Sequence, residues 1–311
     1  MILSDFVLTM SPSPEIQDAV VLRRIGTASL IELRTPPRAN EHRADHIADA
    51  HDNSLCIYQQ LGSSSRFSGN PGFCIHHGMF ATSYSNLPYE TAALAADGFH
   101  LRILKVPAAD LRPSQADLVK AGLGDLVPKP LCENGALVPL LASCFRDLKE
   151  TDDAREPARA RSLVQALAQL ALIERGLIRP GSRAAQHALR VGRLSLARRL
   201  IERNISRSTL SPRLVADLLG ISVRHLHILF EATGISFAQT VTAERLAESR
   251  RLLTQPRERS ISEIALACGF NSVATFYRAF QAAHGNSPGS FRATRGAHGL
   301  PSATLDWAEV K

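Results

Sequence analysis

Three patterns of hydrophobic and polar positions follow one another along the chain. Residues 1–25 are interrupted by Ser11-Pro-Ser-Pro14, which is typical of an extended arm. From there to about residue 107, short apolar runs alternate with turn residues, and such runs predict strands. We expect these strands at 28–33, 54–59, 73–75 and 100–106. From residue 136 onward, apolar residues recur every three or four positions, which predicts helices.

The change of period predicts an α+β protein with two domains, which suits a length of 311 residues. We expect an antiparallel β sandwich or barrel with added helices first, and an all-helical domain after it. The expected boundaries are an arm at 1–25, the β domain with its helices at 26–178, a linker at 179–190, the helical domain at 191–296 and a tail at 297–311.

The helical region contains a near-repeat at an offset of about 50 residues. In each copy a short apolar-faced helix ends at a glycine, Gly220 or Gly269, and a second helix follows at once. The buried face of that second helix carries Phe230 in the first copy and Phe280 in the second. Two short helices joined by a tight turn form a helix-turn-helix, so the sequence predicts two such units.

The positive charge of the chain is concentrated in the same region. Residues 187–296 contain 16 arginines against 7 acidic residues, whereas residues 1–186 contain 19 basic and 20 acidic residues. This asymmetry favours a polyanion-binding module attached to a neutral one. A basic domain that is only well solvated is the alternative.

The second copy carries a longer motif, G-F-x-S-x-x-x-F-x-R-x-F, followed by G-x-S-P and F-R, over residues 269–292. This spacing resembles the signature of the AraC/XylS family of transcription regulators, and the resemblance extends over residues 194–295. It implies a cytoplasmic DNA-binding activator with double-stranded DNA and RNA polymerase as partners. No cofactor and no enzymatic activity are implied.

Three N-terminal segments, 78–84, 88–90 and 101–107, are similar to the cupin-like sensing domain found in this family. The resemblance implies that the β domain is a cupin-like barrel that binds a small organic effector, with aromatic carboxylates among the candidates. We expect apolar walls and a cation for an anionic group. The candidate pocket residues are Arg34, His42, Ile57, Phe73, Phe80, Tyr84 and Arg102, with Leu33 as a further wall.

The second helix of each unit is expected to present its outward N-terminal half to DNA bases. The family's base-reading positions fall on Arg224, His227, Ile228, Val273, Ala274 and Arg278. An arginine pairs bidentately with guanine, so Arg224 and Arg278 are the expected specificity determinants; a solvated helix face is the alternative for either one. Contacts to the DNA backbone are expected from Ser211, Ser222, Ser272, Thr275 and Tyr277.

We expect a homodimer, because two subunits would double the DNA contacts. The apolar stripe of Leu163, Leu167 and Leu170 is the candidate dimer seam. The alternative is that this helix only caps the β domain and that the protein is a monomer without DNA.

Two further groups of residues leave other functions open. His42, His46 and His51 have a spacing that resembles metal ligands, and a cupin-like metalloenzyme fused to a DNA-binding domain is one alternative. Oxidation of Cys56 or Cys74 is another, although five scattered cysteines without a CxxC pair suit free thiols in a reducing compartment. The cupin HxH pattern, catalytic motifs and apolar runs of 18 residues are absent from the sequence, so we expect no metal site, no enzyme and no membrane span.

Overall fold

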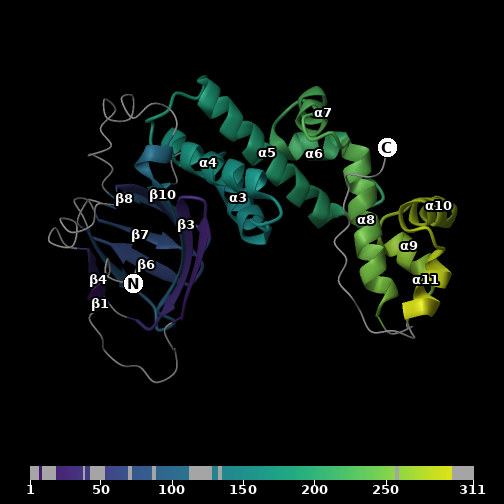
Figure 1. Ribbon diagram of the computed structural model, residues 1–311, viewed down its shortest axis with the longest axis horizontal. Helices are drawn as coiled ribbons and strands as arrows, with labels where there is room; N and C mark the ends of the chain where they lie inside the picture. The colour runs from purple at the N-terminus through teal and green to yellow at the C-terminus, as the bar shows by residue number, and fades with distance from the viewer. Residues whose placement is uncertain are drawn as a thin grey trace. The chain divides into compact units, whose positions relative to one another are not determined.

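The computed structural model describes residues 7–8, 19–37, 39–42, 53–68, 72–85, 89–111, 128–131, 135–255 and 259–295 (Figure 1). The chain divides into two compact units, Met1–Leu196 and Ala197–Lys311. The tail expected at 297–311 lies outside the described residues.

The first unit contains two antiparallel sheets. The larger has the order β11 (Lys129–Leu131), β8 (Phe80–Tyr84), β5 (Ser54–Gln60), β10 (Phe99–Pro107), β3 (Ala28–Thr35) and β2 (Ala19–Ile25). The smaller has the order β1 (Val7–Leu8), β4 (Ala39–His42), β9 (Tyr89–Ala93), β6 (Ser64–Phe67) and β7 (Phe73–His76). The four strands predicted from the sequence are confirmed as β3, β5, β7 and β10. The described strands pair into two separate sheets and do not form a closed ring.

The larger sheet is buried on both faces, as strand β5 shows. Cys56 and Tyr58 belong to a core shared with the smaller sheet, in which the Tyr58 and Phe67 rings are 5.6 Å apart. Leu55 and Ile57 point to the other face and pack in a core with the helices. A strand covered on both faces reads as a continuous apolar run, which explains the absence of alternation in its sequence.

Helices α3 (Val138–Glu150) and α4 (Pro157–Glu174) cover the second face of the larger sheet (Figure 1). Leu163, Leu167 and Leu170 of α4 are 3%, 0% and 0% exposed within this single chain. The prediction that they form a dimer seam is therefore wrong, because the core of one subunit already uses them. The 3₁₀ turn η1 (Ala108–Asp110) follows β10 at the edge of the same layer.

Two expected segments have a different structure from the one predicted. Residues 19–25, expected in an arm, form β2, which pairs along its whole length with β3. The prolines before Ala19–Leu22 favour an arm in the sequence, whereas pairing with β3 makes this segment a strand. Residues 183–190, expected in a linker, are the first part of helix α5 (Arg183–Asn204), which continues past the division between the two units.

The second unit is helical, and its helices begin and end close to the predicted signals. They are α6 (Pro212–Leu219), α7 (Val223–Glu231), α8 (Phe237–Leu253), α9 (Ile261–Ala267), α10 (Val273–His284) and α11 (Pro288–Arg295). Helix α8 starts with a capping box in which Ser236 and Gln239 satisfy each other's backbone N–H groups. Among the described helices of both units, none has the length and apolar character that crossing a membrane requires.

Candidate nucleic-acid interface

The first helix-turn-helix unit consists of α6 and α7. Ser211 caps α6 by accepting a hydrogen bond from a backbone N–H of its first turn at 3.3 Å, and Pro212 follows as the first helical residue. Gly220 ends α6 in the left-handed conformation, with φ 63°. Ser222 then caps α7, and its Oγ accepts from the N–H of His225 at 3.1 Å. These local signals place the two helices one short turn apart.

The second unit, α9 and α10, uses the same devices. Ser260 and Glu263 form a capping box, in which the Ser260 N–H donates to Glu263 Oε2 at 2.6 Å. Gly269 makes the turn with φ 81°, a backbone conformation that favours glycine. Ser272 caps α10 by accepting from the N–H of Thr275 at 3.1 Å. Both predicted helix-turn-helix units are thus present.

The side chains expected to read bases lie on the outer faces of α7 and α10, with one difference. Five are exposed: Arg224, His227, Ile228, Ala274 and Arg278. Val273 is half-buried and packs against the core of the second helix-turn-helix unit, which leaves only part of its surface for a ligand.

Arg224 and Arg278 are the arginines of these two helices, and they occupy different positions. Arg224 is the second residue of α7, whereas Arg278 is the sixth residue of α10. Within the part of the chain that the structure describes, neither guanidinium is engaged in a hydrogen bond or an ion pair. Both side chains are therefore available to an external acceptor, and they would meet it at different places along the helix.

The residues expected to contact the DNA backbone lie near the helix starts. Ser211, Ser222 and Ser272 use an Oγ lone pair to cap their own helices, so each hydroxyl hydrogen remains a potential donor. The Ser272 hydroxyl also lies 2.9 Å from the exposed Thr275 hydroxyl. Tyr277 is half-buried, with its ring 6.0 Å from Phe276.

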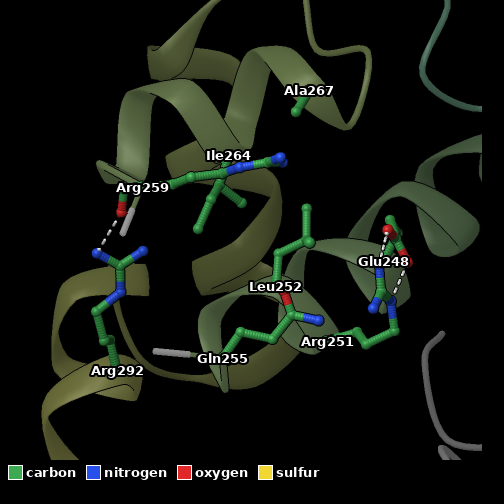
Figure 2. A pocket seen from close by; sticks show the side chains of 8 residues that line it. All are labelled: Glu248, Arg251, Leu252, Gln255, Arg259, Ile264, Ala267 and Arg292. Carbon is green, nitrogen blue, oxygen red and sulfur yellow. Dashed lines mark hydrogen bonds and ion pairs between the residues drawn. The ribbon is translucent and has the colours of Figure 1, made fainter. Parts of the chain in front are cut away.

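A basic pocket of about 330 Å³ lies between α8, α9 and α11, and none of its lining residues belongs to α7 or α10 (Figure 2). Arg251 donates to Glu248 at 2.7 and 2.6 Å, and Arg292 donates to the backbone carbonyl of Arg259 at 3.0 Å. Sequence reasoning missed this pocket, because its arginines are spread over three segments that no single helical period connects.

The expected effector residues of the first unit do not come together in one cavity. Ile57, Phe80 and Tyr84 lie in the core beneath the helices, whereas Phe73 packs in the core between the sheets. Arg34 is exposed, and Leu33 is half-buried. His42 belongs to β4, but its side chain lies outside the described part of the structure.

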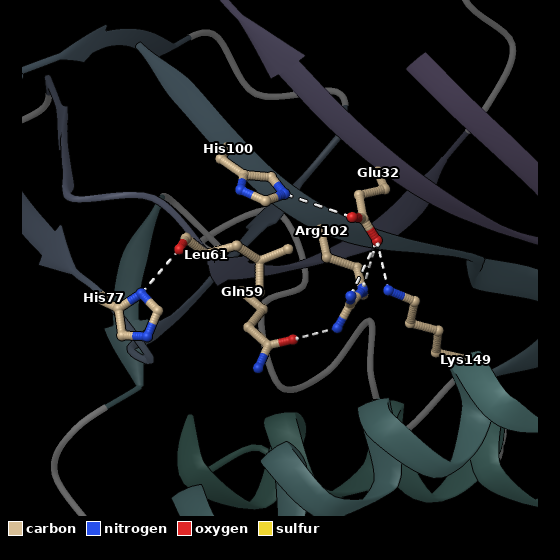
Figure 3. Close-up of polar contacts among 7 residues, drawn as sticks. All are labelled: Glu32, Gln59, Leu61, His77, His100, Arg102 and Lys149. Atoms are coloured by element: carbon tan, nitrogen blue, oxygen red, sulfur yellow. Dashed lines mark hydrogen bonds and ion pairs between the residues drawn. The ribbon is translucent and has the colours of Figure 1, made fainter. Parts of the chain in front are cut away.

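Arg102 is held inside the first unit by a polar network (Figure 3). Its guanidinium donates to Glu32 Oε2 at 2.9 Å and to Gln59 Oε1 at 3.0 Å, and its side chain is 10% exposed. His100 and Lys149 also lie within 3.6 Å of the Glu32 carboxylate. Burial raises the pKa of Glu32, but the hydrogen bonds and charges of Arg102, His100 and Lys149 outweigh it, so this pKa lies below its ordinary value. Arg102 therefore has internal partners for most of its donors.

The described cysteines and histidines give no positive support to the metal and redox alternatives. Cys56, Cys74, Cys144 and Cys268 form no disulfide within the described residues, and burial raises the pKa of Cys144 to about 12. Among the residues that the structure describes, no cluster of three metal-ligating side chains was found. His46 and His51 fall outside them.

Comparison with known proteins places the helical unit in a family. The model of a helix-turn-helix domain family matches residues 215–294. The HTH-type transcriptional regulator GlxA of Rhizobium meliloti (strain 1021) is 43% identical over 97 residues, which are 31% of this chain and 28% of that protein. The transcriptional activator NphR of Rhodococcus sp. is 31% identical over 99 residues, 32% of this chain and 29% of that protein. The AraC-like transcriptional activator CuxR has a crystal structure with a TM-score of 0.46 and 20% identity, covering 79% of this chain and 86% of that one.

Two capped helix-turn-helix units joined by α8 define a double helix-turn-helix domain. Together with the long motif at 269–292 and the match over 215–294, they show that the C-terminal domain belongs to the AraC/XylS family. The aligned segments span less than a third of GlxA and of NphR.

Proposed function

We propose that the chain is a sequence-specific, DNA-binding transcription regulator. The observation that carries this proposal is the pair of exposed guanidiniums of Arg224 on α7 and Arg278 on α10. The opposite faces of both helices are buried in the cores of their helix-turn-helix units. Side chains on such helices reach base edges in the major groove, where arginine recognises guanine. Since the two arginines occupy different helix positions, each unit reads its own sequence.

The base-reading residues in this proposal are Arg224, His227, Ile228, Val273, Ala274 and Arg278, and the phosphate contacts come from Ser211, Ser222, Ser272, Thr275 and Tyr277. Ile228 is 48% exposed and suits contact with a thymine methyl group rather than a hydrogen bond. The excess of arginine over residues 187–296 supplies the general attraction to phosphates.

The experiment is footprinting of the full chain on the DNA upstream of its own gene, with binding measured against salt. We expect protection of two major-groove segments about one turn, ~34 Å, apart, because one chain carries both recognition helices. The logarithm of affinity should fall steeply with the logarithm of salt concentration, because each phosphate contact releases counterions. Absence of duplex binding, or binding independent of salt, would refute the proposal.

We further propose that the regulator is a cytoplasmic activator that works with RNA polymerase, responds to a small organic effector and acts as a homodimer. The activator role is supported by the name of the relative NphR, and the effector role by the separate β unit with its sandwich of two sheets. This unit resembles a cupin-like sensing domain in its sequence segments at 78–84 and 101–107. Transcription from the footprinted promoter, with and without candidate acids, tests activation and response together.

A further inference from the structure

A second cavity, of about 370 Å³, lies in the N-terminal unit, Met1–Leu196, between α4, the β2–β3 turn and the end of β10. Its size suits a small organic molecule. None of the expected effector residues lines it. The sheet side contributes Ile25, Val106 and Leu111 as apolar walls, and the turn contributes Thr27.

Helix α4 faces this cavity with two parallel rows of side chains at a spacing of four residues, which places each row along one side of the helix. One row is apolar and consists of Val164, Ala168 and Leu172. The other row is polar and consists of Arg161, Gln165 and Gln169. Along the polar row exposure falls from Arg161, which is exposed, through Gln165, which is half-buried, to Gln169, which is 6% exposed. The row therefore runs from solvent into the interior.

The polar row is unusual for this helix, because Leu163–Glu174 is otherwise almost entirely apolar and buried. Gln169 places a buried amide at the inner end of this row, beside the apolar walls of the cavity. Arg161 makes no hydrogen bond or ion pair to any described residue, whereas its neighbour Arg159 is paired with Glu156 at 2.9 Å. The charge of Arg161 is thus open to an anion at the mouth.

We propose that this cavity binds a small carboxylic acid with an apolar body. The carboxylate pairs with Arg161 at the mouth, the body packs against Val164, Ala168 and Leu172, and a polar group at the far end meets Gln169. Asp110 also lines the cavity, but its carboxylate accepts a hydrogen bond from the Thr27 hydroxyl on the opposite wall from α4. The inference rests on the proposed effector response, for which it supplies the site and the chemical class.

The test is isothermal titration of the full chain with benzoate, 2-naphthoate and octanoate, each compared with its uncharged amide. We expect at least one acid to bind about tenfold or more tightly than its amide, because only the acid pairs with Arg161. Arg161→Gln should remove this preference, whereas the matched control Arg159→Gln, on the same helix but outside the cavity, should leave it unchanged.

A second variant, Ala168→Leu, fills the cavity and should weaken binding by roughly tenfold or more while the melting temperature shows that the unit is folded. If Ala168→Leu does not fold, the exposed Arg161 position still decides the question. The proposal is overturned if none of the three acids binds, or if Arg161→Gln binds them as wild type does. Binding of duplex DNA is measured on the same samples. Loss of DNA binding would contradict the DNA-binding proposal. DNA binding without acid binding would contradict only the proposal that the cavity binds an acid.

Discussion

The two helix-turn-helix units share their spacing and their caps but differ in their cores. In the first unit α7 buries Leu226, Leu229 and Phe230, and the Phe230 ring packs edge-on against Phe237 of α8 at 5.6 Å. In the second helix-turn-helix unit, rings from α10 and α11 surround Phe280, and Phe270 of the preceding turn packs against Phe276. The helix-turn-helix motif therefore specifies positions for apolar side chains rather than one set of residues, so the two copies can differ in stability.

The turns of the two units also differ in their surroundings. Gly220 and Gly269 both have a positive φ, 63° and 81°. A Cβ added at Gly220 would meet nothing within 4 Å, whereas one at Gly269 would lie 2.3 Å from the carbonyl oxygen of Ile205. Of these two turns, the one at Gly269 is in close contact with the backbone at Ile205, whereas the one at Gly220 has open space beside it.

Phe280→Ala should have the largest effect on stability, about 3–5 kcal/mol. Phe280 is fully buried, and its ring lies 5.5 Å from those of Phe276 and Phe291 and 4.5 Å from that of His284. The matched change Phe230→Ala should cost less, because fewer rings surround that side chain. Urea unfolding of both variants measures the difference, and equal losses would show that the aromatic cluster does not set the second unit apart.

The two turns can be compared directly by changing each glycine to alanine. Gly220→Ala should cost about 1–2 kcal/mol, the strain of a left-handed backbone with a Cβ. Gly269→Ala should cost a further ~1–3 kcal/mol, because the added carbon overlaps the Ile205 carbonyl. Melting temperatures of the two variants report the order. A Gly269→Ala variant as stable as Gly220→Ala would mean that the contact at Ile205 relaxes freely.

Arg278→Ala should weaken binding to the footprinted site by roughly 1–3 kcal/mol while changing binding to random DNA little. Arg224→Ala should behave in the same way but relax specificity at a different base pair, since the two arginines lie at different helix positions. Affinities for cognate and random duplexes measure both effects. An equal loss on both kinds of DNA would identify the arginine as a phosphate contact.

The stability of the second helix-turn-helix unit should also depend on pH through His284, and this is the smallest of the expected effects. Burial lowers the pKa of His284 below its ordinary value of 6.5, and the charge of Arg250 lowers it further. As the pH falls through about 6.5, His284 takes up a proton in the unfolded state but stays neutral in the folded state. The free energy of unfolding therefore falls. His284→Phe keeps the ring packing and should reduce this slope between pH 7 and 5.5. An unchanged slope would assign the acid response to groups other than His284.

The C-terminal fold could be predicted closely from the sequence, because its signals are local. Caps such as Ser211 and Ser260 and the glycine turns act within a few residues, and helix periodicity shows which side chains remain outside. The exposed positions of Arg224 and Arg278 follow from the same periodicity.

The N-terminal unit was less predictable, because its arrangement depends on residues distant in sequence. Strand β5 is apolar on both sides, so its sequence does not tell that Ile57 and Cys56 face different cores. The sequence shows the apolar stripe on α4, but such a stripe does not reveal whether a sheet or a second subunit covers it. The polar row at Arg161 becomes visible only when the β2–β3 turn is placed opposite α4.

The close approach of Gly269 to Ile205 couples the folding of the two helix-turn-helix units. Arg245 of α8 donates to the carbonyls of Ile205 and Arg207, and its guanidinium lies 5.8 Å from the Phe270 ring, beside the same turn. These contacts join the segment before the first helix-turn-helix to the turn of the second. The first helix-turn-helix lies in the sequence between the two joined segments. Opening either unit releases the ends that hold the other, so the two copies of the motif should unfold and refold as one cooperative body.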